Sequence, residues 1–169
     1  YTIIYTIKDS FKYKDVKRIR EFVIIIDTSG SVSGELVQTI IKKTYNILKN
    51  TESFFSKINL HIIQCDAEVQ EAIKITSQED FDEYLKNMKL RGFGGTDFRP
   101  AFSYVDELIK KGEFTRLKGI IYLTDGWGIF PERKPNYDAA FVFIREDNFN
   151  PNVPPWAIKL VLDKKKHKQ

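Results

Sequence analysis

The sequence predicts a three-layer, Rossmann-like α/β fold. We expect a mostly parallel sheet of about six strands, one of them an antiparallel edge strand, with helices on both faces. The first observation behind this prediction is that apolar runs alternate with segments whose apolar residues recur at helical spacing. The second is that the first run, Phe22–Ile26, is continuously apolar and does not alternate, as is typical of a parallel strand buried on both faces. The third is the link Asp66–Glu68, which is too short for a parallel crossover and predicts a hairpin.

Length and composition favour one globular domain. The chain has 169 residues, of which 42% are hydrophobic and 30% are charged, and these values exclude a mainly disordered protein. The formal net charge is +4, but four lysines of the C-terminal tail account for the whole excess: Lys164, Lys165, Lys166 and Lys168. Because a basic tail of this kind is usually solvated, we expect no nucleic-acid partner.

Cysteine usage and the chain ends bear on compartment and domain organisation. Cys65 is the only cysteine, which excludes an internal disulfide and favours a reducing, cytoplasmic compartment. No stretch approaches the roughly 18–20 consecutive apolar residues of a membrane span, so we expect no membrane association. The chain begins at Tyr1 rather than Met. We therefore expect residues 1–20 to end a longer upstream region, with an edge hairpin as one arrangement, residues 21–163 to form the domain and residues 164–169 a basic tail.

A run of apolar residues predicts the first strand, and apolar residues at helical spacing predict the first helix. Phe22–Ile26 is continuously apolar and leads into the Ser- and Gly-rich turn Thr28–Gly34. Ser33 is placed to cap the amino end of a helix that stops near Asn50. The apolar face of this helix consists of residues at helical spacing: Leu36, Val37, Ile40, Ile41, Thr44, Ile47 and Leu48.

The next elements are a hairpin and a short helix. Ile58–Cys65 and Val69–Ile75 are the two predicted hairpin strands. Ser77–Asp80 resembles a capping box, in which an acidic residue stands at the third helical position. It predicts a short helix with an apolar face of four residues: Phe81, Tyr84, Leu85 and Met88.

The second half of the chain repeats the strand and helix pattern only once. The glycine-rich loop Arg91–Asp97 precedes a helix in which Pro100 suits the first turn and which Gly112 ends. Three further runs complete the predicted sheet: residues 120–124, 139–144 and 156–162. The connections between them, residues 125–138 and 145–155, carry five prolines and little helical periodicity. We therefore expect one face of the sheet to be partly uncovered there.

Three short pieces carry oxygen ligands at predicted strand ends. Asp27–Ser31 has one carboxylate and two hydroxyls at alternate positions in a loop that contains a glycine. Gly94–Asp97 offers the hydroxyl of Thr96 beside two glycines, which allow close approach of the backbone. Thr124–Gly126 carries the carboxylate of Asp125. Because open α/β sheets bind ligands at the carboxyl ends of their strands, we expect these side chains to gather at one edge.

The oxygen ligands predict a hard cation. Mg²⁺ is the first expectation and Mn²⁺ or Ca²⁺ the next, while the lack of Cys and His argues against structural zinc. Two carboxylates roughly neutralise such an ion, and hydroxyls fill coordination positions without adding charge. A cation held in this way stays electrophilic towards an incoming acidic group.

This pattern resembles the metal-ion-dependent adhesion site (MIDAS) of von Willebrand factor A (VWA) domains, including integrin I domains. The resemblance implies the VWA fold. It also implies that five residues hold the metal directly or through water: Asp27, Ser29, Ser31, Thr96 and Asp125. A Glu or Asp of a partner protein is then expected to complete the coordination.

The chain is more closely similar to the bacterial VWA-like domain family. The resemblance covers about residues 21–162 and is carried by these segments in order: 23–31, 63–67, 94–100, 123–128, 130–131 and 154–156. Members of that family are often called metallopeptidases because some carry a separate N-terminal peptidase-like domain. Intracellular bacterial A domains also often work beside MoxR-type AAA+ ATPases, so the resemblance implies such an ATPase as a partner.

Three further residues have a structural and a functional interpretation. Asp97 is more often a cap in such a loop, and its alternative role is to touch the metal through water. Asp66 could approach the same edge, although a hairpin-turn role is favoured. Trp127 either flanks the metal face and contacts a partner or fills space.

Three functions compete, and a metal-dependent protein-interaction module leads. An enzyme is the second hypothesis, but a zinc peptidase needs a pattern such as His-Glu-x-x-His, and the chain has only His61 and His167. An aspartyl phosphotransferase would want an acid at position 29, which is Ser. We therefore expect no catalysis by this chain. The alternative is the regulatory or C-terminal domain of a metallopeptidase or hydrolase whose catalytic domain lies elsewhere, and the third hypothesis is a scaffold that binds no metal.

Overall fold

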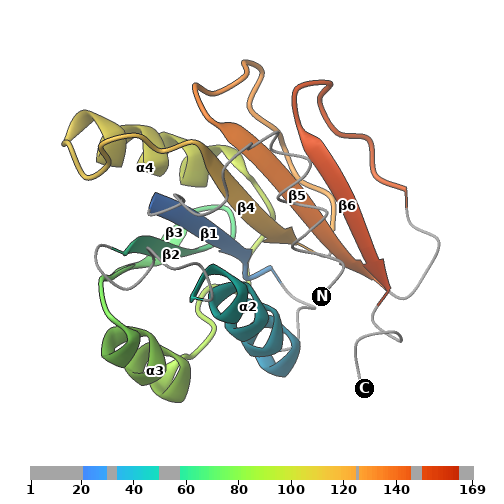
Figure 1. The fold of residues 1–169 in the computed structure, drawn as a ribbon. Helices are drawn as coiled ribbons and strands as arrows, with labels where there is room; N and C mark the ends of the chain where they lie inside the picture. Colours follow the sequence, from blue (N-terminus) through green and yellow to red (C-terminus); the bar gives the residue numbers. More distant parts are fainter. Residues whose placement is uncertain (1–20, 30–33, 50–57, 125, 146–149, 164–169) are drawn as a thin grey trace.

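The computed structural model describes residues 21–29, 34–49, 58–124, 126–145 and 150–163. Within them the chain forms a six-stranded sheet in the order β3-β2-β1-β4-β5-β6. Only β2 and β3 pair antiparallel, and every other neighbouring pair is parallel. The predicted α/β fold, with a mostly parallel sheet and one antiparallel edge strand, is confirmed (Figure 1).

The strand bounds follow the apolar runs closely. The six strands are β1 Glu21–Asp27, β2 Asn59–Cys65, β3 Val69–Ile75, β4 Gly119–Thr124, β5 Asp138–Arg145 and β6 Ile158–Asp163. In β1 every residue after Glu21 is buried, because β2 and β4 flank the strand within the sheet while helices cover both faces. The last strand begins two residues later than expected, since Trp156 leaves the sheet edge to pack against Phe102 at a ring-centroid distance of 6.1 Å.

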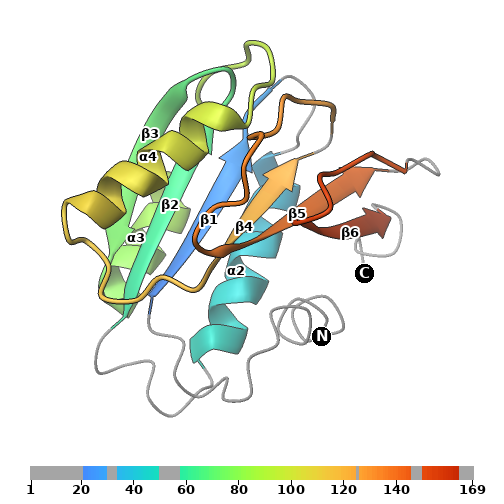
Figure 2. The same cartoon turned by 90° about the horizontal axis from the view of Figure 1, so that it is seen from above.

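The helices form a layer on each face of the sheet (Figure 2). They are α2 Gly34–Lys49, α3 Gln78–Asn87 and α4 Arg99–Lys110. Helices α2 and α3 share one core with alternate residues of β1, β2 and β4. Helix α4 packs into a second core on the opposite face. The central strands therefore contribute to both cores, and both faces of β1 are shielded from solvent.

Local signals fix the helix ends. The Ser77 hydroxyl accepts a hydrogen bond from the Asp80 amide at 3.1 Å, and Asp80 in turn accepts from the Thr76 amide, as the capping-box pattern predicted. Pro100 lies in the first turn of α4, and Gly112, just beyond its end, has a φ of 77°. The predicted cap Ser33 and the stop at Asn50 lie outside the described residues, as do residues 1–20 and the tail 164–169.

Irregular chain replaces helices in the two last connections. The described parts, residues 126–137 and 150–157, contain no helix, as their prolines suggested. The expectation that this leaves the sheet uncovered is wrong for β5, because Phe130 and Trp156 from these connections pack into the core beside α4, and Phe141 and Phe143 are fully buried there. It holds for β6, where Val161 is 43% exposed.

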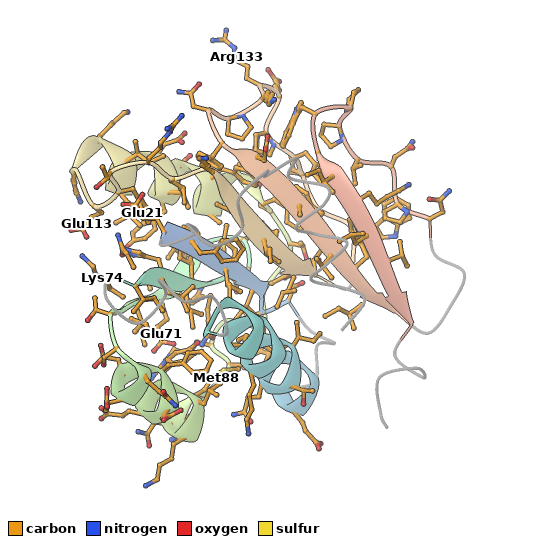
Figure 3. The ribbon with its side chains drawn as sticks, viewed as in Figure 1. Glu21, Glu71, Lys74, Met88, Glu113 and Arg133 are labelled. Carbon is orange, nitrogen blue, oxygen red and sulfur yellow. The ribbon has the colours of Figure 1, made fainter. Side chains whose placement is uncertain are left out.

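The amino ends of the strands are tied together by charged side chains (Figure 3). Glu21 accepts hydrogen bonds from the amides of Thr115 and Arg116, both at 2.6 Å. Lys74 forms an ion pair with Glu113 at 2.8 Å. These contacts hold the chain that leads into β4 against β1 and β3, so they support the register on which the opposite edge depends.

No helix among the described residues is long and apolar enough to cross a membrane.

Candidate metal centre

The candidate site begins where β1 and β4 end together. These strands are parallel and Ile26 lies opposite Leu123, so the next residues, Asp27 and Thr124, are neighbours. Both are fully buried, and the Thr124 hydroxyl donates a 2.5 Å hydrogen bond to Asp27 Oδ2. The parallel register thus places a buried carboxylate at the carboxyl edge of the sheet, where a ligand is expected.

A short chain of hydroxyls converges on this carboxylate. Asp27 Oδ1 accepts from the Ser29 amide at 2.9 Å and from the Ser29 hydroxyl at 2.6 Å. The Thr96 hydroxyl, 67 positions away in sequence, donates to Ser29 Oγ at 2.6 Å. Three of the five predicted ligands, Asp27, Ser29 and Thr96, are therefore brought together. Ser31 and Asp125 lie outside the described residues.

The donor set fits a hard divalent cation. The atoms that meet are one carboxylate and hydroxyl oxygens, the ligands that Mg²⁺ prefers. In an octahedral Mg²⁺ shell, ligands about 2.05 Å from the ion lie about 2.9 Å from one another, so the 2.6 Å contacts around Ser29 need to open only slightly. The described residues contain no cluster of three or more His, Cys, Asp or Glu side chains.

Asp66 holds the loop that carries Thr96. Its Oδ1 accepts from the Glu68 amide at 3.0 Å and from Gln70 at 2.9 Å, which closes the β2–β3 turn. Its Oδ2 accepts from the Gly94 amide at 2.9 Å. The hairpin-turn role favoured by the sequence is therefore present, and the same carboxylate also positions the glycine-rich loop.

Close backbone approach explains two of the three glycines of that loop, Gly92 and Gly94. A Cβ at Gly92 would lie 2.7 Å from Asp66 Oδ2 and 2.8 Å from the Thr28 hydroxyl oxygen, and Gly92 has a φ of 118°. A Cβ at Gly94 would lie 2.8 Å from Asp66 Oδ2. The Phe93 amide donates to the Thr28 carbonyl at 3.2 Å. The loop is thus packed directly against the residue between Asp27 and Ser29.

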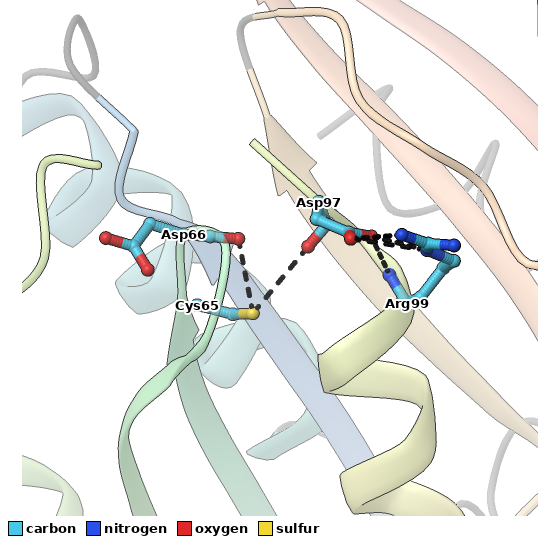
Figure 4. Close-up of polar contacts among 4 residues, drawn as sticks. All are labelled: Cys65, Asp66, Asp97 and Arg99. Atoms are coloured by element: carbon cyan, nitrogen blue, oxygen red, sulfur yellow. Dashed lines mark hydrogen bonds and ion pairs between the residues drawn. The ribbon is translucent and has the colours of Figure 1, made fainter. Parts of the chain in front are cut away.

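The Asp97 carboxylate pairs with Arg99 at the start of α4 (Figure 4). Three contacts to the Arg99 side chain span 2.8–3.2 Å, and the Arg99 amide donates to Asp97 Oδ1 at 3.0 Å. Hydrogen bonding by Arg99 holds the pKa of this carboxyl below its usual range. The capping role is the one that this geometry supports.

Cys65 lies between the β2–β3 turn and the start of α4, and its thiol has low reactivity. Its thiol faces the carbonyls of Asp66 and Asp97, with sulfur–oxygen distances of 3.5 and 3.9 Å (Figure 4). Burial raises the pKa of the thiol to about 11, so the thiolate is scarce at neutral pH. Cys65 is fully buried and packs in the α4 core as a small apolar side chain.

The sequence interpretation missed several residues at this edge. Thr124 was noted only as a strand end, yet it hydrogen-bonds Asp27, and counting the parallel register from β1 to β4 would have found it. Phe93 and Ile129 were not singled out as functional, and they are 62% and 52% exposed. Trp127, for which two roles were open, is 66% exposed and does not fill interior space.

His61 and two surface hollows lie away from this edge. His61 is buried in β2 against Phe114, and burial, with a smaller contribution from Lys74, lowers its pKa. One hollow of about 420 Å³ lies between β3 and α3, and another of about 680 Å³ lies at the amino ends of β4 and β5. Neither is lined by Asp27, Ser29 or Thr96.

Comparison with known proteins identifies the family. No curated protein matches the chain. The family model described as VWA-like domain (DUF2201) matches residues 22–163, a range that includes every residue of the candidate site and all of the six strands except Glu21 of β1. A buried aspartate at the end of a central parallel strand, hydroxyls converging on it, and a match over most of the sequence lead to one conclusion: the chain belongs to the VWA-like domain family.

Proposed function

We propose that this domain is a metal-dependent protein-interaction module. In this proposal Mg²⁺ is held by Asp27, Ser29, Ser31, Thr96 and Asp125, and the bound cation supplies an electrophilic position for a Glu or Asp of a partner protein. Mn²⁺ and Ca²⁺ are the alternative ions. The proposal assigns binding to this chain and no catalytic step.

The observation that carries the proposal is the hydroxyl chain on Asp27. The carboxylate is buried and accepts hydrogen bonds from the Ser29 amide, the Ser29 hydroxyl and the Thr124 hydroxyl. A buried carboxylate that is satisfied by hydroxyls can exchange those hydrogen bonds for a cation, because the hydroxyl oxygens can rotate their lone pairs towards it.

The surrounding contacts support the proposal by making the site rigid. Asp66 fixes the Thr96 loop through Gly94, and the Phe93 amide fixes it to Thr28. Ligands held on pre-positioned loops lose little conformational freedom when a cation binds. The resemblance adds a context that these contacts do not address, a MoxR-type AAA+ ATPase as the expected partner.

The test of metal binding is thermal unfolding of the chain in EDTA and then in excess Mg²⁺, Mn²⁺ or Ca²⁺. A cation at about 100 times its dissociation constant stabilises the folded state by about 2.7 kcal/mol, which raises the Tm of a domain of this size by roughly 5–10 °C. We expect this rise in the wild type and its loss in Asp27→Asn, which keeps the shape of the side chain but removes its charge. Thr96→Val should reduce the rise, because it replaces one hydroxyl ligand by a methyl group of similar volume.

The matched control is Asp80→Asn. Asp80 accepts from the Thr76 amide and hydroxyl, both at 3.1 Å, beside the amino end of α3, and it plays no part in the candidate site. This variant should lower the baseline Tm slightly and keep the full metal-dependent rise. If the wild type shows no rise with any of the three cations, or if Asp27→Asn responds as the wild type does, the proposal is wrong.

A further inference from the structure

Exposed apolar side chains are concentrated beside the candidate site. The described residues include five large exposed hydrophobics: Phe93, Ile109, Trp127, Ile129 and Val161. Three of them, Phe93 at 62%, Trp127 at 66% and Ile129 at 52%, belong to two loops at the carboxyl edge of the sheet. They are also the three most exposed of the five. Single exposed hydrophobics are common, but a group around one site indicates an interaction surface.

The backbone at Phe93 strengthens this interpretation. Phe93 has a φ of 72° and is the only described residue other than glycine with a positive φ. This left-handed conformation is unfavourable for a bulky side chain, and Gly or Asn is the usual choice there. Folding gains little burial in return, since most of the ring stays in solvent. Strain of this kind at an exposed aromatic residue points to a role outside the fold.

Each of the three residues is connected to the candidate site by a backbone contact or by its place in the sequence. Phe93 is hydrogen-bonded through its amide to Thr28, which lies between Asp27 and Ser29. Ile129 forms a bridge with Asp97, the residue after Thr96. Trp127 is the second residue after Asp125 in sequence. The apolar side chains therefore come from both loops that border the buried carboxylate.

We infer that Phe93, Trp127 and Ile129 form an apolar rim that selects a protein segment in which an acidic residue is flanked by bulky apolar residues. The inference rests on the proposed function, because the acidic residue of the segment is the Glu or Asp that the bound cation would coordinate. Exposed aromatic side chains act as anchors at protein interfaces and exclude water from the contacts they surround. Excluding water also strengthens the charged contact at the centre, because the local dielectric constant falls.

The chemistry of the centre selects this occupant over others. A cluster of carboxylate and hydroxyl oxygens that holds a cation needs an anionic ligand, and the rim needs apolar surface. A protein segment with one acid between apolar residues supplies both. A purely apolar surface, such as the rim of a second copy of the chain, offers no acid to the centre.

The experiment uses the full chain with Mg²⁺ and a library of short peptides that have a fixed central glutamate and randomised flanks. We expect enriched peptides to carry an aromatic or branched apolar residue within two positions of the glutamate, and their binding to be lost in EDTA. Trp127→Ser and Phe93→Asn should each weaken the binding of an enriched peptide by at least about tenfold. Ile109→Ser, which removes an exposed hydrophobic on α4, is the matched control and should leave binding unchanged.

Phe93→Asn separates a role in binding from a role in folding. Asparagine tolerates a positive φ, so this variant should keep or raise the Tm and keep the Mg²⁺-dependent rise while it loses peptide affinity. A structural role for Phe93 would instead lower the Tm.

The outcomes distinguish failure of the rim from failure of the metal site. If Mg²⁺ fails to stabilise the chain, the proposed function is wrong and the inference falls with it. If Mg²⁺ stabilises the chain, three results would show that only the rim is wrong. These are that no peptide is enriched, that the enriched peptides show no preference for apolar flanks, or that Phe93→Asn and Trp127→Ser bind an enriched peptide as the wild type does. A dimer seen by sedimentation that Trp127→Ser dissolves would identify a second copy as the occupant and overturn the inference.

Discussion

Asp66 joins two parts of the chain through one carboxylate. Burial by itself raises the pKa of this group, but hydrogen bonds from Gln70, the Glu68 amide and the Gly94 amide outweigh burial and hold the pKa below its usual range. The side chain is only 6% exposed. The charged form therefore stabilises the folded state, because it is the form that accepts hydrogen bonds at both oxygens.

We expect Asp66→Asn to lower the free energy of unfolding at neutral pH by about 1–3 kcal/mol. The variant replaces one accepting carboxylate oxygen by an amide nitrogen, which cannot accept the hydrogen bond that is donated at that position. The stabilisation by the carboxylate is present above the ordinary aspartate pKa of about 4 and is lost as the pH falls through the lower folded-state value. Urea unfolding of wild type and variant should therefore converge as the pH falls from about 7 to about 2.

Glu68→Gln is the control for this series, since Glu68 is the exposed neighbour in the same turn. It should leave the wild-type pH profile nearly intact. A difference between wild type and Asp66→Asn that stays the same at every pH would show that the charge of Asp66 contributes nothing.

At the scale of elements, the loop after β4 is packed onto the start of α4. Phe98, which precedes α4, is fully buried, and its amide donates to the Ile129 carbonyl at 3.1 Å. A Cβ at Gly128 would lie 2.6 Å from two atoms of the Phe98 ring. The ring also packs against Tyr122, Phe130 and Phe141 at centroid distances of 4.9–5.2 Å, so it has little freedom to move.

Gly128→Ala should therefore destabilise the protein by about 1–3 kcal/mol, the usual cost of forcing an extra carbon into a packed core. The matched control is Gly95→Ala, because a Cβ at Gly95 meets no atom within 4 Å and its φ is not positive. Denaturant midpoints of the two variants measure the difference. Equal midpoints would show that the loop can shift away from Phe98 without cost.

The elements that could be predicted are those whose signals are local. The β1 run, the β2–β3 hairpin and the start of α4 can each be inferred from a few adjacent residues, and each appears as expected. The contacts of the site are different in kind. Thr124 meets Asp27 across 97 positions and Asp66 meets Gly94 across 28, so both depend on strand register and loop placement. The cover over β5 was also missed, because aromatic side chains in irregular chain carry no periodic signal.

At the scale of the whole molecule, one sheet serves two cores. Alternate residues of β1 belong to opposite clusters, for example Ile24 to the core of α2 and α3 and Ile25 to that of α4. Neither core can be lost without exposing one face of the same strands. This arrangement favours a single cooperative unfolding transition.

We expect far-ultraviolet circular dichroism and tryptophan fluorescence to give the same unfolding midpoint. The two tryptophans sample different places: Trp156 packs on Phe102 in the α4 core, and Trp127 is exposed in the loop after β4. Trp127→Phe leaves Trp156 as the only reporter and tests the core directly. Two separated transitions would indicate that the cores unfold independently.

The pairing of β1 with β4 also has a consequence for when the site forms. Asp27 is synthesised 97 residues before Thr124, an interval of roughly 5–20 seconds at ordinary translation rates. During that time β1 has no β4 beside it, and Asp27 has no Thr124 hydroxyl to accept from. The loop that carries Thr96 also lacks its bridge to Ile129. A nascent chain therefore carries the first half of the candidate centre without the second, and we expect competence for ligand to arise late in synthesis, after β4 has emerged and closed the middle of the sheet.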